Sequence, residues 1–399
     1  MRASLLIVLA LIAFGLQAKA QEMTMPDHPY RVVGYYAGWS VYRDYAVADI
    51  PAEQLTHINY SFANISEEGE IVVGDPWADT DMPDPDDDTD AVLQGNFRQL
   101  MLLKEAYPHL QTLIAVGGWT WSGRFSDVAL TDESRQKFAR SAVNFMVAYG
   151  FDGGDIDWEY PTGGGDADNI RRPEDPENFV LLLQQLRDQL DARGQADDRH
   201  YLLTIASGAG GPTYEPLDWA RIHPLLDWIN VMTYDMAGPW NSVTGLHAPL
   251  YPTSENPPEG TSVDTAMQGY LALGVPADKL VMGVPFYGRG FANVSPHNNG
   301  LHQPFNGLPA GTREAGTYDY ADLTAHYVTE ATRQWHETAL VPWFYDPETR
   351  VMISYDDAQS LALKAEYIVD NGMGGIMIWE LSTDDGTLLQ AIDNALSDR

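Results

Sequence analysis

Eight short runs rich in valine, isoleucine, tyrosine and tryptophan recur along this chain of 399 residues, and each ends in small or polar residues. Amphipathic stretches fill several gaps between them. In the stretch 131–149, Phe138, Ala142, Phe145 and Met146 have the spacing of one helix face. Further helical stretches are expected at 177–191, 262–273 and 357–369. The strand-like runs cover 31–38, 55–65, 110–119, 150–160, 201–208, 227–235, 279–288 and 374–380.

This alternation predicts an α/β fold in which eight parallel strands close into a (β/α)8 TIM barrel. Parallel neighbours need a crossover connection, and a closed sheet has no exposed edge. A doubly wound open sheet is the alternative. It would be expected to carry a glycine-rich phosphate-binding turn after an early strand, and the sequence has neither a G-x-G-x-x-G motif nor a P-loop.

The seventh and eighth runs are separated by about ninety residues, which is far more than an ordinary connection in such a barrel. We therefore expect a small α+β insertion between strands 7 and 8, at 289–350, that interrupts a barrel spanning 21–399. Six aromatic side chains are expected to form its small core or a wall over the barrel mouth. They are Tyr318, Tyr327, Trp335, Trp343, Phe344 and Tyr345.

The first twenty residues have the pattern of an export signal. Arg2 precedes an apolar run at 5–16, and Ala18-Lys19-Ala20 resembles a cleavage site. The apolar run is too short to span a bilayer comfortably. We expect residues 1–20 to be a signal peptide and the mature protein to be secreted to the extracellular space or periplasm. A retained membrane anchor is the alternative.

Charge and cysteine content exclude several classes of function. The 57 acidic residues outnumber the 23 basic ones, and a net charge of −34 repels nucleic acids and anionic lipids. The absence of cysteine excludes disulfides, thiolate metal sites and cysteine nucleophiles. The ten histidines show no H-E-x-x-H spacing. We therefore expect no cofactor or metal, and no nucleic-acid or membrane partner.

The acidic stretch 75–90 suggests a calcium site, because aspartates alternate at Asp84, Asp86, Asp88 and Asp90. It lacks the glycine and the closing glutamate of an EF-hand loop. Runs of charge are usually solvated loops, and we favour that interpretation here.

The fourth run carries three acids at alternate positions, Asp155, Asp157 and Glu159, with Ile156 and Trp158 between them. Side chains alternate across a strand, so the acids share one face, with neighbouring α-carbons about 6.6 Å apart. In a barrel we expect this face to point toward the axis and the C-terminal mouth, where such enzymes have their active sites. Like charges in a partly dry site cannot all stay ionised, which makes Glu159, nearest the mouth, a candidate general acid. A solvated edge strand is the alternative.

These residues resemble the D-x-x-D-x-D-x-E signature of glycoside hydrolase family 18, the chitinases, as Asp152-x-x-Asp155-x-Asp157-x-Glu159 followed by Tyr160-Pro161. The resemblance covers nearly the whole mature chain. One departure is Ala115, where the family often has a serine that hydrogen-bonds the first inward aspartate. Further motifs follow in order, namely Gly34-Tyr35-Tyr36, Gly117-Gly118-Trp119, Met232-x-Tyr234-Asp235, 283–289 and Trp379-Glu380.

The resemblance implies substrate-assisted hydrolysis, in which the sugar's own acetamido oxygen attacks the anomeric carbon. Glu159 would be the general acid and base, Asp157 would orient the acetamido group, and Asp155 would share a proton with Asp157. Tyr234 would hydrogen-bond the acetamido oxygen, and Asp235 would bind sugar and tune Glu159. We give Asp152 a structural role, because its position has the wrong parity for the inner face.

Sugar rings stack on aromatic planes, so Trp119, Trp121, Trp240 and Trp379 are candidate subsite residues, with burial in the core as the alternative for each. By analogy with the family, Trp379 would form the floor of the subsite that holds the distorted sugar. Trp219 and Trp228 are expected in the core. The motifs add further candidate substrate-binding residues, which are Tyr35, Tyr160, Met232, Tyr287 and Arg289.

We therefore expect a secreted, monomeric endo-chitinase that cleaves β-1,4 bonds between N-acetylglucosamine units with retention, acting on chitin and chito-oligosaccharides. The alternatives are an endo-β-N-acetylglucosaminidase, a peptidoglycan hydrolase and a non-catalytic chitin-binding lectin. Such lectins usually lose the acid, and this chain keeps Glu159.

Overall fold

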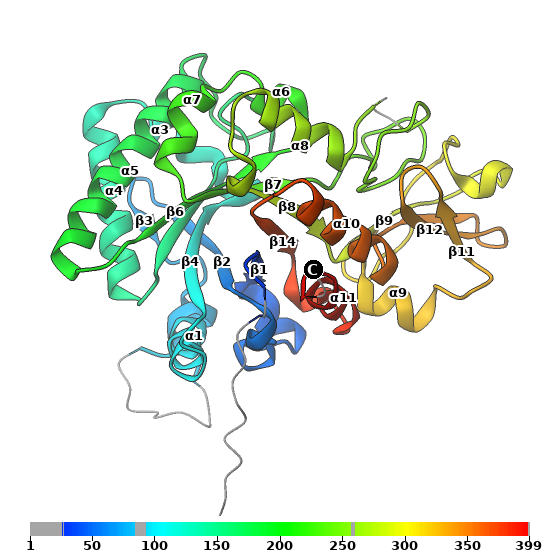
Figure 1. Ribbon diagram of the computed structural model, residues 1–399, viewed down its shortest axis with the longest axis horizontal. Helices are drawn as coiled ribbons and strands as arrows, with labels where there is room; N and C mark the ends of the chain where they lie inside the picture. Colours follow the sequence, from blue (N-terminus) through cyan, green and yellow to red (C-terminus); the bar gives the residue numbers. More distant parts are fainter. Residues whose placement is uncertain (1–25, 27, 84–92, 257–259, 398–399) are drawn as a thin grey trace, which may run out of the picture.

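The computed structural model describes residues 26, 28–83, 93–256 and 260–397 (Figure 1). The expected signal peptide at 1–20 and the four alternating aspartates at 84–90 lie outside these residues. Within the described part of the chain, no helix has both the length and the apolar composition of a membrane span.

Eight parallel strands form a closed barrel, which confirms the (β/α)8 prediction (Figure 1). Neighbours around the barrel follow chain order, and the first strand closes the ring by pairing with both the second and the last. Each predicted strand-like run contains one of these strands. They are β1 (Arg31–Ala37), β2 (His57–Ile65), β4 (Gln111–Gly117), β5 (Gly153–Asp157), β6 (Leu202–Gly208), β7 (Trp228–Met232), β8 (Leu280–Pro285) and β14 (Gly375–Trp379).

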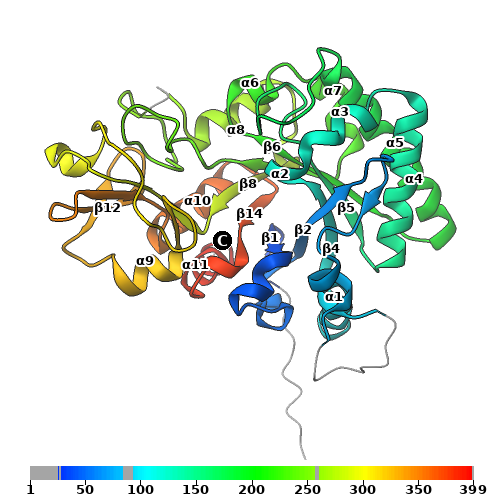
Figure 2. The same cartoon turned by 180° about the vertical axis from the view of Figure 1, so that it is seen from behind.

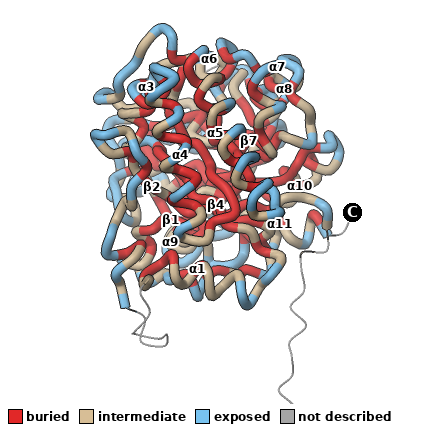
Figure 3. Tube along the Cα trace, turned by 90° about the vertical axis from the view of Figure 1, so that its left-hand side faces the viewer, coloured by how far each residue is buried: buried red, intermediate tan, exposed pale blue. Residues whose placement is uncertain are grey.

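Helices cover the outside of the barrel, and the barrel strands that they enclose are almost continuously buried (Figures 2 and 3). The four helical stretches expected from the sequence, at 131–149, 177–191, 262–273 and 357–369, are all present. The helices around the barrel are α1 (Gly95–Ala106), α4 (Asp132–Ala148), α5 (Asp175–Asp197), α8 (Val263–Ala272), α10 (Ala358–Asp370) and α11 (Thr387–Ser397), with short α2 (Gly118–Trp121), α3 (Phe125–Val128), α6 (Gly211–Tyr214) and α7 (Trp219–Ile222).

Helix α4 illustrates how local sequence sets an element. The Thr131 hydroxyl accepts a hydrogen bond from the backbone N–H of Ser134 at 3.1 Å, which caps the first turn. The predicted apolar face is buried against the barrel. Its side chains are Phe138, Ala142, Phe145 and Met146.

A second, antiparallel sheet lies in the chain between β8 and β14 and stands to one side of the barrel (Figure 1). It begins at Tyr287 and ends at Ser354, so it extends slightly beyond the expected insertion at 289–350. Phe291, Trp343 and Tyr345, which belong to strands of this sheet, form part of a small separate core. The sheet's strands are β9 (Tyr287–Phe291), β10 (Thr317–Asp319), β11 (Arg333–His336), β12 (Val341–Asp346) and β13 (Val351–Ser354), and α9 (Tyr320–His326) follows β10.

The described part of the acidic stretch corrects one expectation. After the two-residue strand β3 (Ile71–Val72), residues 77–81 form a turn of π-helix rather than a solvated loop. Asp79 is buried there and accepts hydrogen bonds from the Tyr60 hydroxyl and from the Asp75 backbone. No group of three or more acidic or histidine side chains suited to a metal ion occurs among the described residues.

A buried ion pair joins the second sheet to the barrel's helical layer. Lys364 on α10 donates to Asp356, just after β13, at 2.6 Å, and neither side chain is exposed to solvent. Ser360 also donates to Asp356, at 2.7 Å. Each charge is thus compensated by the other.

We expect Lys364→Met to lower the free energy of unfolding by about 3–5 kcal/mol, because the Asp356 charge would stay buried without its partner. Urea denaturation measures this change. The double variant Lys364→Met/Asp356→Asn, which removes both charges, should lose less than the single variant. A loss below about 1 kcal/mol, the range of exposed pairs, would contradict this role.

Candidate active site

The three alternating acids lie inside the barrel at its C-terminal end. Asp155 and Asp157 belong to β5, and Glu159 follows two residues after the strand. Their exposed fractions are 0%, 4% and 8%. Trp158, between them in sequence, instead packs outward, with its ring stacked on Phe125 at 5.4 Å. The strand therefore divides acid from apolar side chains as its alternation predicts.

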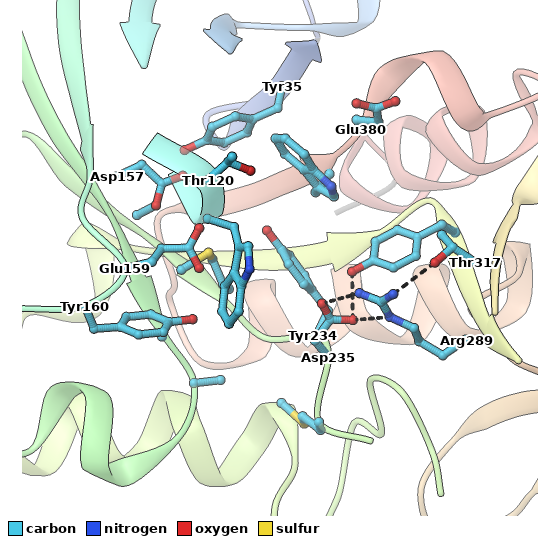
Figure 4. A pocket seen from close by; sticks show the side chains of 18 of the residues that line it. Tyr35, Thr120, Asp157, Glu159, Tyr160, Tyr234, Asp235, Arg289, Thr317 and Glu380 are labelled. Atoms are coloured by element: carbon cyan, nitrogen blue, oxygen red, sulfur yellow. Dashed lines mark hydrogen bonds and ion pairs between the residues drawn. The ribbon is translucent and has the colours of Figure 1, made fainter. Parts of the chain in front are cut away.

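A cleft of 1290 Å³ opens above these acids (Figure 4). It brings together four of the five predicted catalytic residues, while Asp155 does not line it and is fully buried in the barrel. All nine predicted substrate-binding residues line it. The predicted residues along the cleft are Asp157, Glu159, Tyr234, Asp235, Tyr35, Trp119, Trp121, Tyr160, Met232, Trp240, Tyr287, Arg289 and Trp379.

Asp155 is held by donors from three other strands. The Tyr35 hydroxyl donates to it at 2.6 Å and the Asn230 amide at 3.1 Å, and the Thr204 hydroxyl donates as well. Burial raises the pKa of Asp155, and these hydrogen bonds oppose that rise. The methyl group of Ala115 offers Asp155 no hydrogen-bond donor. Thr204 and Asn230 donate to Asp155, and the sequence analysis did not identify either residue.

Burial also sets the protonation of the other two acids. It raises the pKa of Asp157 well above its usual value, and the charges of Glu159 and Asp155 add to the rise. Burial raises the pKa of Glu159 to about 7. The interaction with Tyr160 opposes this rise, and the charge of Asp235 adds to it. The ladder therefore holds protons near neutral pH, which a general acid requires.

The backbone around Glu159 is fixed by two polar side chains. The Ser122 hydroxyl accepts from the Glu159 N–H at 2.9 Å and donates to the Asp157 carbonyl at 3.0 Å. The Asn169 amide donates to the Glu159 carbonyl at 2.9 Å. Ser122 begins a short 3-10 helix (Ser122–Arg124) and Asn169 lies on a loop, and the sequence analysis identified neither residue.

Asp235 is bound by a bidentate contact with Arg289 (Figure 4). The two N–H···O distances are 2.7 and 2.6 Å, and the Tyr287 hydroxyl donates at 2.9 Å. Burial alone would raise the pKa of Asp235, but the charge and hydrogen bonds of Arg289 outweigh it and lower the pKa. Asp235 is thus a fixed negative charge beside Glu159.

The aromatic residues differ in exposure. Trp119 and Trp240 are 53% and 58% exposed, which leaves ring faces open to a ligand. Trp379 is half-buried and stacks on Phe62 at 5.7 Å. Trp219 and Trp228 are buried, and their predicted place in the core is confirmed.

The cleft is also lined by charged residues that the sequence analysis did not identify, namely Arg43, Arg313 and Asp319. Arg43 donates to Glu380 at 3.1 Å, and Arg313 donates to Asp319 at 2.8 Å. Arg313 and Asp319 come from the region of the second sheet. The Trp379-Glu380 motif was the one sequence signal for this wall.

A closed barrel with a buried carboxyl ladder under an aromatic cleft defines a site suited to carbohydrate hydrolysis. The model of glycosyl hydrolases family 18 matches residues 31–384, and the chain belongs to this family. It is therefore a glycoside hydrolase, and its relatives are of the chitinase type.

Three of these relatives show the extent of the similarity. Chitinase A1 of Niallia circulans is 43% identical over 97% of this chain, which spans 61% of that protein's length. Chitinase ChiA74 from Bacillus thuringiensis superimposes with a TM-score of 0.88 at 40% identity, covering 92% of this chain and 70% of that one. Ostrinia furnacalis Group IV chitinase, in complex with allosamidin, superimposes with a TM-score of 0.82 at 34% identity. The superposition covers 92% of this chain and 99% of that one.

We expect Thr204→Val to lower the free energy of unfolding by about 1–3 kcal/mol, because Asp155 would lose a donor inside the barrel. Thr204→Ser, which keeps the hydroxyl, should lose clearly less. Urea denaturation at neutral pH compares the two variants. Equal losses would show that the methyl group, rather than the hydrogen bond, matters at this position.

Proposed function

We propose that this chain is an endo-chitinase that hydrolyses β-1,4 linkages between N-acetylglucosamine units with retention of configuration. The observation that carries the proposal is the buried carboxyl ladder that ends at Glu159 on the cleft floor, where burial raises the pKa of Glu159 to about 7. The similarity to named chitinases over most of the chain supports the substrate class.

In the first step, the carbonyl oxygen of the substrate's acetamido group attacks the anomeric carbon, and the glycosidic bond breaks. Glu159 gives its proton to the leaving oxygen. One carboxylate oxygen of Asp157 is buried and has no hydrogen-bond partner among the described residues, so it is suited to accept the acetamido N–H. As positive charge develops on the oxazolinium ring, Asp157 stabilises it and shares its proton with Asp155.

In the second step, the ionised Glu159 removes a proton from water, and the water oxygen attacks the anomeric carbon from the face that the leaving group occupied. The oxazolinium ring opens and configuration is retained. Tyr234 donates to the acetamido oxygen throughout. No carboxylate of the enzyme forms a covalent bond with the sugar.

The aromatic cleft suits an extended polymer of one sugar. We assign Trp379 to the floor of the subsite at the cleaved bond, and the exposed Trp119 and Trp240 to neighbouring subsites. An endo-β-N-acetylglucosaminidase or a peptidoglycan hydrolase would need the same acetamido chemistry with a different neighbouring sugar, and product analysis separates them.

We also propose that residues 1–20 direct export and that the mature enzyme works as a monomer on chitin outside the cytoplasm. The export proposal is supported by Arg2, the apolar run and the small residues that follow it.

Product analysis on acetylated and fully deacetylated chitin oligomers tests the reaction. The enzyme should release products from the acetylated oligomer alone, because the deacetylated sugar has no carbonyl oxygen to attack with. Equal cleavage of both would overturn acetamido assistance. A bacterial wall preparation tested in parallel should stay intact if the substrate is chitin.

Glu159→Gln should lower kcat by at least about 10²–10⁴-fold while retaining oligomer binding, because glutamine keeps the shape but cannot transfer the proton. Kinetics and calorimetric titration with the acetylated oligomer measure the two effects. Loss of binding together with turnover would indicate a collapsed site, and full turnover would exclude Glu159 as the acid.

The pH profile should follow the raised pKa of Glu159. Glu159 is protonated below a pKa of about 7 and can act as acid there, so kcat/KM should fall as pH rises through about 7. Tyr160→Phe removes an interaction that lowers this pKa and should move the alkaline limb to higher pH. Tyr201→Phe, at the opposite end of the barrel, is the matched control and should leave the limb unchanged. A limb that stays in place in Tyr160→Phe would contradict the assignment.

A further inference from the structure

His247 is a buried histidine next to the active site that none of the sequence motifs includes. It lies on the segment between β7 and α8 and is 1% exposed. Its backbone is anchored on both sides, since its N–H donates to Ser354 at 2.7 Å and its carbonyl accepts from Met236 at 3.0 Å. Its ring packs against Tyr287 at 4.8 Å. The imidazole therefore has a fixed position.

The ring contacts Asp235 through the backbone. The Asp235 N–H donates to Nδ1 of His247 at 3.1 Å. Because Nδ1 uses its lone pair as acceptor, the proton of the neutral ring lies on Nε2, which is buried and has no hydrogen-bond partner among the described residues. A carboxylate oxygen of Asp235 lies 3.4 Å from the same Nδ1.

Asp235 has an unusual backbone conformation that needs such support. Its φ angle is +55°, in the left-handed region that residues other than glycine rarely adopt. Residues stay in this region when the surrounding structure holds them there. This conformation places the Asp235 carboxylate against Arg289 and Tyr287. The contact with His247 is thus part of what orients the charge beside Glu159.

Burial, more than the charges around the ring, keeps His247 neutral. Burial lowers the pKa of His247 to about 3, Asp235 acts in the opposite direction, and Arg289 and Lys364 lower it further. The acceptor lone pair on Nδ1 is therefore present throughout the range in which a general acid with a pKa near 7 works.

We propose that His247 is a positioning residue, whose neutral ring holds the Asp235 backbone and thereby fixes the carboxylate that faces Arg289, Tyr287 and the cleft. It touches no reacting atom in the proposed mechanism and acts through Asp235. The effect of His247 on catalysis rests on the proposed chitinase function. The hydrogen bond between the Asp235 N–H and His247 can be tested without any measurement of activity.

Two substitutions separate positioning from simple space filling. His247→Asn places an amide oxygen where Nδ1 stands and keeps an acceptor, whereas His247→Leu fills the space without one. We expect His247→Leu to lower kcat/KM on an acetylated chitin oligomer by about 10-fold, the equivalent of one lost hydrogen bond. We expect His247→Asn to restore most of this loss.

The pH profile gives a readout that a purely structural role would not move. Asp235 raises the pKa of Glu159, so releasing the Asp235 carboxylate should shift the alkaline limb of kcat/KM to lower pH in His247→Leu. His247→Asn should keep the limb in place. His57→Leu, a matched change of a buried histidine at the start of β2, should change stability but not the limb. An unshifted limb in His247→Leu, or equal shifts in both His247 variants, would overturn the proposal.

Long-range ¹H–¹⁵N NMR spectra of the unmodified full chain, with labelled histidine, test the contact directly. We expect His247 to be neutral with its proton on Nε2 and to stay so down to acidic pH. A proton on Nδ1, or a charged ring near neutral pH, would overturn the proposal even if His247→Leu failed to fold. If the enzyme did not cleave the oligomer, the proposed function would fail and this spectrum would still decide the role of His247.

Discussion

The site depends on keeping three carboxyl groups away from water inside a closed barrel. Burial is the largest influence on the pKa of Asp155, Asp157 and Glu159, and it favours the protonated forms of all three. The surrounding polar groups then make the three environments different. Asp155 receives several donors, while Asp157 has a buried oxygen without a described partner. One strand thereby carries acids with different chemical tasks, because each faces a different set of neighbours.

The barrel and the direction of the acid ladder could be predicted because both depend on periodicity within single segments. Thr204 and Asn230 could not be found this way. Thr204 meets Asp155 only through the register of β5 against β6, and Asn230 only because β7 follows β6 around the barrel. His247 is harder still to predict, since it reaches Asp235 along an irregular segment and depends on a left-handed backbone.

The second sheet is part of the site rather than an independent neighbour. Arg289 on β9 holds Asp235, and Ser354 on β13 accepts a hydrogen bond from the His247 backbone. Arg313 and Asp319 extend the cleft wall from the same region. A long insertion can be recognised from sequence length alone, but its contribution to the charge beside Glu159 depends on how the two sheets meet. The chemistry of the barrel is therefore set partly by residues outside it.

Asp152 lies on the same segment as the ladder but belongs to the opposite end of the barrel. Lys104 and Arg199 bind its carboxylate at 2.5 and 2.6 Å, and the Thr112 N–H donates to it at 2.8 Å. Seven residues along the chain, Glu159 forms no ion pair with a cationic side chain of the described residues, and it lines the cleft. One segment therefore carries carboxylates with opposite duties: the paired charge of Asp152 ties the base of the barrel to its neighbours, whereas Glu159 at the mouth is left able to release its proton.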